Sequence, residues 1–147
     1  MNKKCVKTPL MKISLISRVS HKMMRNESEK MGYNQSYRSI IFFLNNIHDG
    51  ATQAELVEHS KLSKPTISLT LQKMESDGLI VRKQDDVDLR NVRVYLTDLG
   101  VKAEETFIKI GNQTEMKVLS VLDAEEQEVL DKILDKILDN MKEHGEK

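Results

Sequence analysis

The stretch from Ser63 to Gly78 constrains the fold more than any other part of the sequence. Its pattern predicts a helix, because Ser63 can cap the first turn by accepting a backbone amide and Pro65 falls where no amide is needed. Gly78 can end that helix, since glycine readily takes the left-handed conformation that follows a helix C-terminus. Four side chains recur at helical spacing and are expected to face a core. They are Ile67, Thr70, Leu71 and Met74.

The opposite side of this predicted helix suits the major groove of DNA. It carries hydroxyls, two lysines, a glutamine and an outward leucine, with no acidic residue before Glu75. Hydroxyls and lysines can contact phosphates, glutamine can pair with adenine, and leucine can touch a thymine methyl group. These side chains are Lys64, Pro65, Thr66, Ser68, Leu69, Gln72, Lys73 and Ser76. The segment alone leaves open an ordinary amphipathic helix with a polar solvent side.

The neighbouring segments add the rest of a winged helix. Residues 52–59 predict a short helix with a capping box, in which Thr52 and Glu55 each satisfy a free backbone amide. A turn at 60–62 then leads into the Ser63 helix, giving helix-turn-helix order. Two β-prone runs, 79–83 and 92–96, bracket a polar tip and predict a hairpin. We therefore expect a mainly α fold with a small β-hairpin wing.

The same segments resemble the MarR family of winged helix-turn-helix transcriptional regulators. The matching runs are Thr52-Gln53, Leu62 to Ser68, Asp77 to Ile80, Asp88-Leu89-Arg90 and Val94 to Thr97. The resemblance implies a homodimer that binds a two-fold symmetric operator on double-stranded DNA. It also implies that the regulator commonly represses, and often releases DNA when a small-molecule effector binds.

The wing motif of Asp88 and Arg90 resembles the family's D-x-R motif, in which the acid orients an arginine that enters the minor groove. A narrow A·T-rich minor groove concentrates negative potential and attracts such an arginine. The alternative is an ordinary surface ion pair that contributes little.

The full set of expected DNA contacts follows from the helix and the wing together. We expect base-edge contacts from Lys64, Pro65, Thr66, Leu69 and Gln72. Backbone contacts are expected from Gln53, Ser68, Lys73 and Arg82. Ser63, Asp88 and Arg90 complete the predicted set.

The remaining segments predict helices for dimerisation. The first helix is expected from Pro9 to about Lys30. The second is expected from Asn34 or Ser36 to Ile47, and its apolar residues on nearly all sides between Ile40 and Leu44 predict that it is the buried centre of the domain, covered on nearly all sides. After the wing, a long helix is expected with Thr97 as its N-cap, and a last helix is expected with a cap at Asp123 to Glu126. The last helix carries a regular apolar stripe at Val129, Leu130, Ile133, Leu134, Ile137, Leu138 and Met141.

That stripe favours pairing between two subunits, although packing on the first helix is the alternative. We therefore expect residues 1–32 and 101–147 to form a dimerisation region, and 33–100 the DNA-binding domain. The Ser63 helices of the two subunits would then contact DNA half-sites roughly 34 Å apart.

Composition limits the remaining possibilities. The formal net charge is zero, but residues 101–147 hold twelve acidic against seven basic side chains, so positive charge is concentrated before them. No segment has the apolar length of a membrane span, and no apolar stretch typical of a signal peptide follows the charged start. We expect a cytoplasmic protein. The single cysteine, Cys5, can form no internal disulfide. It is either a free thiol or, as the resemblance to MarR-like regulators implies, a peroxide-sensing one.

Catalytic and metal-binding motifs are not evident in the sequence. The four histidines are scattered, and no phosphate-binding loop, nucleophile elbow or pair of catalytic carboxylates is apparent, so we expect no enzyme, metal or cofactor. Met23, Met24 and Met31 are candidates for an effector pocket, although core filling is the commoner use of methionine. The competing function is a winged-helix protein-interaction module without sequence-specific DNA binding.

Overall fold

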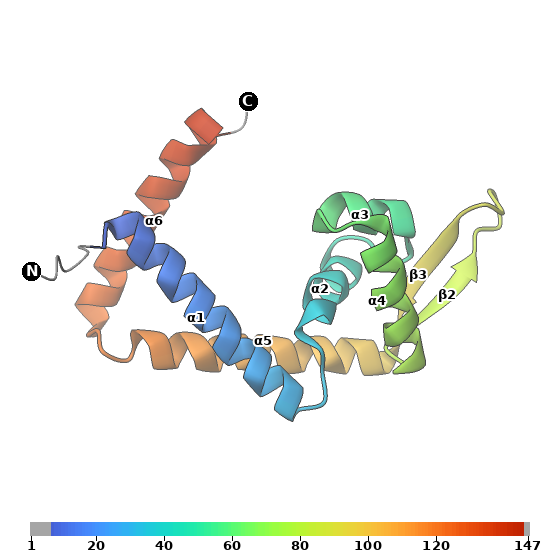
Figure 1. Cartoon of the computed structure of the whole chain (residues 1–147), viewed down its shortest axis with the longest axis horizontal. Coiled ribbons are helices and arrows are strands. Elements are labelled where there is room, and N and C mark those ends of the chain that lie inside the picture. The colour runs from blue at the N-terminus through green and yellow to red at the C-terminus, as the bar shows by residue number, and fades with distance from the viewer. Residues whose placement is uncertain (1–6, 146–147) are drawn as a thin grey trace, which may run out of the picture. The chain divides into compact units, whose positions relative to one another are not determined.

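The computed structural model describes residues 7–145 and is mainly helical, with one small antiparallel sheet (Figure 1). The expected fold class, a winged helix-turn-helix with additional helices before and after it, is confirmed. The chain divides after Asn112 into two compact units, and each is described by itself. The elements are α1 (Pro9–Lys30), η1 (Gln35–Tyr37), α2 (Arg38–Asn46), β1 (Ala51–Thr52), α3 (Gln53–Ser60), α4 (Lys64–Ser76), β2 (Ile80–Gln84), β3 (Val92–Leu96), α5 (Asp98–Leu119) and α6 (Ala124–Gly145).

The first helix has the predicted bounds, but the second begins differently from the prediction. α1 ends before Gly32, whose positive φ of 83° suits a residue without a side chain. Asn34 caps the next segment by accepting from the Ser36 amide at 2.9 Å. That segment starts as the short 3₁₀ turn η1 and becomes α-helical only at Arg38.

The core of the first unit lies between α2, α3, α4, the sheet and the first part of α5. The predicted inward positions of α4 are all buried, as are Leu56 of α3 and Phe107 of α5. Ile40, Ile41, Phe43 and Leu44 of α2 are buried as well. The expectation that this stretch is covered on nearly all sides was wrong at Phe42, which is 51% exposed. The core covers only one side of α2, so one residue of the apolar run points outward.

The sheet contains the predicted hairpin and a third strand that the sequence did not reveal. β2 and β3 pair in antiparallel register with Arg82 opposite Val94, and β1 joins the other edge of β3 with Ala51 opposite Val94. Gly50 precedes β1 with a φ of 86°, and a Cβ there would lie 2.7 Å from the Tyr95 ring. β1 is only two residues long, too short to produce an alternating pattern.

Side-chain caps fix the ends of the helices around this core. The predicted capping box of α3 is present, because Thr52 accepts from the Glu55 amide and Glu55 accepts from the Thr52 amide. Thr97 caps α5 as predicted, accepting from the Gly100 amide at 3.1 Å. Its hydroxyl also donates to the Gly78 carbonyl at 2.6 Å, which joins the end of the hairpin to the end of α4.

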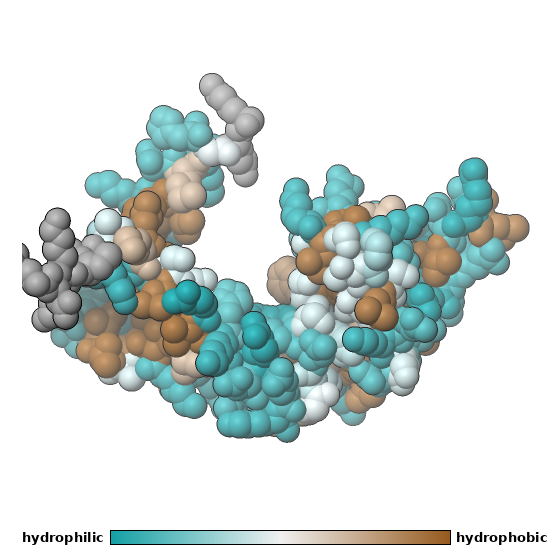
Figure 2. Space-filling model, in the orientation of Figure 1, coloured by the Kyte–Doolittle hydropathy of each residue, from teal (hydrophilic) through white to brown (hydrophobic). Residues whose placement is uncertain are grey.

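The second unit begins at Gln113 and contains the end of α5, a short turn and α6. Asp123 caps α6 as predicted, since its carboxylate accepts from the Glu126 amide at 2.9 Å. The Glu126 carboxylate in turn accepts from the Asp123 amide at 3.0 Å. None of the α6 side chains, all of which the structure describes, is buried. Hydrophobic side chains are visible along this unit in Figure 2. Within α6, the large hydrophobic side chains that are more than one third exposed are Val129, Ile133, Ile137, Leu138 and Met141.

Within residues 7–145, no helix is both long and apolar enough to cross a membrane.

Candidate nucleic-acid interface

Helix α4 begins as its sequence predicts. Ser63 accepts from the Thr66 amide at 3.3 Å, and its hydroxyl lies 2.7 Å from the Thr66 hydroxyl. Pro65 sits in the first turn, and Gly78 follows the helix with a φ of 75°. The inward stripe is almost inaccessible, with Ile67, Leu71 and Met74 at 0% exposure. The rotation of the helix about its own axis is therefore set by burial.

The opposite face of α4 is open to solvent. Every predicted contact residue on this helix is exposed, and Leu69 retains 53% of its accessible surface. The exposed residues are Ser63, Lys64, Pro65, Thr66, Ser68, Leu69, Gln72, Lys73 and Ser76. A duplex could reach all of them without rearrangement of the core.

A buried tyrosine holds the C-terminal end of α4. The Tyr37 hydroxyl donates to a carboxylate oxygen of Asp77, the residue that follows α4, at 2.9 Å. Tyr37 is 4% exposed, and burial together with this hydrogen bond raises its pKa to about 12. The contact joins residues 40 positions apart, so no local pattern could have revealed it.

An ion pair braces α4 against the wing. The Arg82 guanidinium donates to both carboxylate oxygens of Glu75, with Nε–Oε2 at 3.0 Å and Nη2–Oε1 at 3.3 Å. The Arg82 backbone amide donates to the same carboxylate at 3.2 Å. The hydrogen bonds lower the pKa of Glu75 and raise that of Arg82. The predicted contact residue Arg82 is therefore engaged within the protein, and a DNA phosphate would have to share it with Glu75.

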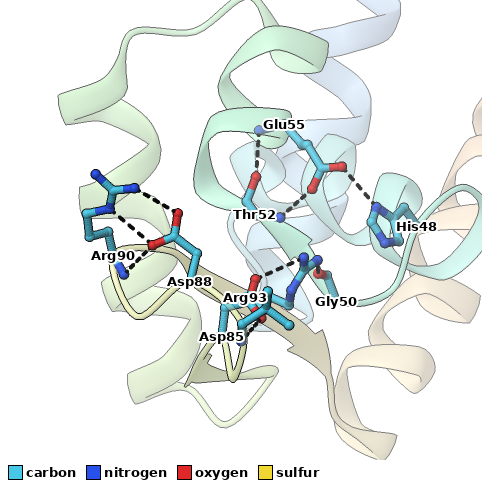
Figure 3. A network of polar contacts seen from close by, with 9 residues as sticks. His48, Gly50, Thr52, Glu55, Asp85, Asp88, Arg90 and Arg93 are labelled. Carbon is cyan, nitrogen blue, oxygen red and sulfur yellow. Dashed lines mark hydrogen bonds and ion pairs between the residues drawn. The ribbon is translucent and has the colours of Figure 1, made fainter.

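The wing motif has the geometry expected of an ordered arginine (Figure 3). Arg90 donates to Asp88 through Nε at 3.1 Å and Nη2 at 3.4 Å, and its backbone amide donates to the same carboxylate at 3.1 Å. The Arg90 side chain is nevertheless 91% exposed. Hydrogen bonding from Arg90 lowers the pKa of Asp88. The carboxylate thus restrains the arginine without covering it.

A second ion pair lies at the base of the wing, and sequence reasoning missed it. Arg93 pairs with Asp85 at 3.1 Å and also donates to the Gly50 carbonyl at 2.9 Å (Figure 3). The Val87 backbone amide, and then Arg93, lower the pKa of Asp85. Two of the three acidic residues in the wing loop are therefore paired with arginines, which offsets their charge near the tip.

A cleft of about 360 Å³ lies between the start of α3, the start of α4 and the wing. It brings together three predicted contact residues, Gln53, Lys64 and Arg90, from three different elements. Its other lining residues are Thr52, Ala54, Val57, Asn91 and Val92. The N-terminus of α3 opens here, and backbone amides at a helix N-terminus attract anions. The cleft can therefore accept a phosphate-bearing backbone.

The three methionines proposed for an effector pocket differ in burial. Met23 and Met24 are half-buried on α1, whereas Met31 is 61% exposed just after that helix. Arg38 donates to the Met24 sulfur at 3.3 Å. Cys5 lies outside the described residues. Within residues 7–145, no three His, Cys, Asp or Glu side chains are grouped so that they could hold a metal ion.

Comparisons with known proteins agree with this geometry. A family model described as the MarR family matches residues 43–92. The transcriptional regulator HosA of Escherichia coli O127:H6 is 38% identical over 80 residues, which are 54% of this chain and 59% of HosA. The HosA protein of Escherichia coli O157:H7 matches to the same extent. The chain thus spans 59% of the length of these curated relatives.

Solved structures resemble nearly the whole chain. Wild-type MarR from Escherichia coli in its apo form has a TM-score of 0.81 at 17% identity, covering 90% of this chain and 98% of MarR. MepR, a transcription regulator of the Staphylococcus aureus multidrug efflux pump MepA, has a TM-score of 0.80 at 26% identity. The match covers 92% of this chain and 99% of MepR. The MepR–DNA complex has a TM-score of 0.71 with the same coverage.

Proposed function

We propose that the protein is a cytoplasmic, sequence-specific DNA-binding transcriptional regulator of the MarR family, because a MarR family model matches its winged helix at residues 43–92. The observation that carries this proposal is the division of α4 into two faces. One face is buried at its apolar positions, and the other exposes every residue of α4 that is expected to contact DNA.

In the proposed complex, α4 lies in the major groove and the wing reaches the minor groove. The N-terminal part of a recognition helix usually contacts base edges, and Lys64, Pro65 and Thr66 occupy that part of α4. Arg90 is free to enter a narrow groove because Asp88 restrains it without covering it. A MepR structure, similar to this chain over 92% of its length, was solved as a DNA complex, which supports a DNA partner for this fold.

The protein is proposed to bind as a homodimer to an inverted repeat. The exposed apolar stripe of α6 supports a second copy as partner, as do Leu10 and Ile16 of α1, which are 70% and 54% exposed. Burial of such side chains is a strong driving force for association. Residues 1–32 and 101–147 would then supply the dimer interface, and 33–100 the contacts with each half-site.

Repression that is relieved by a small apolar effector is the proposed mode of regulation. The half-buried Met23 and Met24, with Met31 nearby in sequence, are the proposed pocket residues, because thioethers adapt to varied apolar ligands. Titration with salicylate should raise the thermal midpoint and weaken DNA binding. If salicylate and related phenolic acids change neither quantity, this part of the proposal is wrong.

Selection of bound duplexes from a random pool tests the proposed function. The full chain should enrich an inverted repeat, and its affinity for that repeat should fall steeply as salt rises. Analytical ultracentrifugation should show a dimer, with two copies on each duplex. Binding without an enriched sequence and with a shallow salt dependence would instead favour the protein-interaction module.

A further inference from the structure

The short turn η1 contacts both the first helix of the chain and the helix proposed to enter the major groove. α1 lies in the region proposed for the dimer interface, whereas α4 lies in the proposed DNA-binding domain. All three elements belong to the first unit of the chain. η1 is therefore placed to connect dimerisation with the position of α4.

One end of this connection is at the end of α1. Ser28 is fully buried, and its hydroxyl lies 2.8 Å from the Gln35 side-chain oxygen in η1 and 2.8 Å from the Met24 carbonyl oxygen. The backbone adds a second link, because the Tyr33 amide donates to the Ser28 carbonyl at 2.9 Å. The Tyr33 ring also packs on Phe107, with 5.6 Å between the ring centroids. Main-chain and side-chain hydrogen bonds therefore hold α1 and η1 together.

The other end of the connection is at the end of α4. The hydroxyl of Tyr37, which is 4% exposed, donates to the Asp77 carboxylate at 2.9 Å. Asp77 is fixed to α4, since its amide donates to the Lys73 carbonyl at 2.9 Å. Within the turn, the Tyr37 amide donates to the Asn34 carbonyl at 3.0 Å. A hydrogen-bonded path thus runs from α1 through η1 to α4.

We propose that η1 is a strut that sets the position of α4 relative to α1, and so fixes the half-site spacing that a dimer accepts. Ser28 and Tyr37 are then positioning residues, because both are buried and act on DNA binding only through α4. The inference rests on the proposed function. It goes further by assigning spacing selectivity to residues that do not reach DNA.

Selectivity for spacing requires a connection of this kind. One added base pair rotates a half-site by about 34° around the duplex and moves it by about 3.4 Å. Two recognition helices held firmly in one dimer cannot both follow that change, so binding to the altered duplex must break a contact in the protein or at the DNA. A protein that already lacks the strut contacts loses less when the spacing is altered.

Affinity for duplexes of different spacing tests the inference. Fluorescence anisotropy compares the selected inverted repeat with versions that carry one base pair more or one fewer between the half-sites. Tyr37→Phe and Ser28→Ala should each reduce the wild-type penalty for altered spacing roughly three- to tenfold, the factor that one hydrogen bond contributes. Affinity for a duplex with a single half-site should not change. A cooperative thermal transition shows that each variant is folded.

Further variants separate the strut from a general loss of stability. Gln35→Ala tests the α1 end at a half-buried side chain and should act like Ser28→Ala. The double variant Ser28→Ala/Tyr37→Phe should reduce the penalty no further than either single variant, because a strut broken at one end no longer transmits. Asp77→Asn keeps an acceptor oxygen for Tyr37 and should keep the wild-type penalty.

Ile41→Val is the matched control. Ile41 is fully buried in α2, and the loss of one methyl group there costs about as much stability as one hydrogen bond. Its side chain takes part in none of the strut hydrogen bonds. The variant should therefore keep the wild-type spacing penalty.

The outcomes distinguish this inference from the proposed function. An unchanged spacing penalty in Tyr37→Phe, or an equally reduced one in Ile41→Val, would overturn the strut and leave a DNA-binding regulator. If Tyr37→Phe reduces the penalty but Ser28→Ala and Gln35→Ala do not, the connection to α1 is wrong. A random pool that yields no inverted repeat would overturn the proposed function, and this inference with it.

Discussion

Helices α4 and α6 are both amphipathic, but they differ in whether their apolar face is buried or exposed. α4 buries its apolar stripe within its own chain and exposes a polar face, whereas α6 exposes its apolar stripe and buries none of its side chains. A stripe buried inside the chain cannot bind a partner, so the function of α4 lies on its polar side. The exposed stripe of α6 leaves apolar surface that a partner can cover. The location of the buried apolar residues therefore indicates which face of each helix is available for binding.

The strongest test of this comparison is to truncate one side chain on each face of α4. Ile67→Ala should lower the free energy of unfolding by about 2–5 kcal/mol, because Ile67 is fully buried and its truncation leaves a cavity. Leu69→Ala, on the same helix but exposed, should lower it by less than about 0.5 kcal/mol. Urea denaturation monitored by circular dichroism measures both. Equal losses would mean that the two faces of α4 are not distinct.

The corresponding test of α6 concerns association. Ile133→Lys combined with Ile137→Lys should weaken the dimer on the order of a hundredfold, because two charges replace buried apolar groups in each copy. Asp131→Asn combined with Asp135→Asn changes the net charge equally on exposed residues off the stripe and should leave the dimer intact. Sedimentation equilibrium measures the dissociation constants. An unchanged dimer in the lysine variant would show that the α6 stripe has another partner.

A smaller effect is expected from the wing. Arg90→Ala should weaken DNA binding by about 1–3 kcal/mol, the range for a specific arginine contact, without changing the unfolding free energy. Arg25→Ala, an exposed arginine of α1, should leave DNA affinity close to that of the wild type. Anisotropy titrations at one fixed salt concentration compare the three proteins. Identical affinity for the Arg90 variant and the wild type would remove the wing from the mechanism.

The smallest expected effect is that of the contact at the end of α4. Tyr37→Phe should cost about 0.5–1.5 kcal/mol of unfolding free energy, the usual contribution of one hydrogen bond. The folded-state pKa of Tyr37 is raised from 10.0 to about 12, so its stabilisation is complete below pH 10 and is lost as pH rises toward 12. The phenylalanine variant should lose less stability across that interval. Parallel curves for the two proteins from pH 9 to pH 12 would contradict this role.

The parts of the fold that sequence predicted correctly are those with local signals. Ser63, Pro65 and Gly78 mark the two ends of α4 within sixteen positions, and the capping box of α3 lies within four. The stripe through Ile67 and Leu71 then fixed which side of α4 is buried. These local rules alone predicted which side chains of α4 are exposed.

The features that sequence did not reveal depend on tertiary contacts. β1 is too short for a pattern and exists because β3 offers a free edge. The pairs Tyr37–Asp77 and Arg93–Asp85 join side chains whose proximity depends on the packed fold. Nothing in the sequence indicated that Arg82 is paired, and only the structure shows its ion pair with Glu75.

Changing the spacing of the half-sites tests the central claim most directly. If two copies of α4 read the same face of the duplex, insertion of about five base pairs between the half-sites turns one of them to the opposite face. We expect two copies of the chain on the selected inverted repeat and a loss of at least tenfold in affinity after the insertion. Affinity that does not change with spacing would contradict paired recognition by α4.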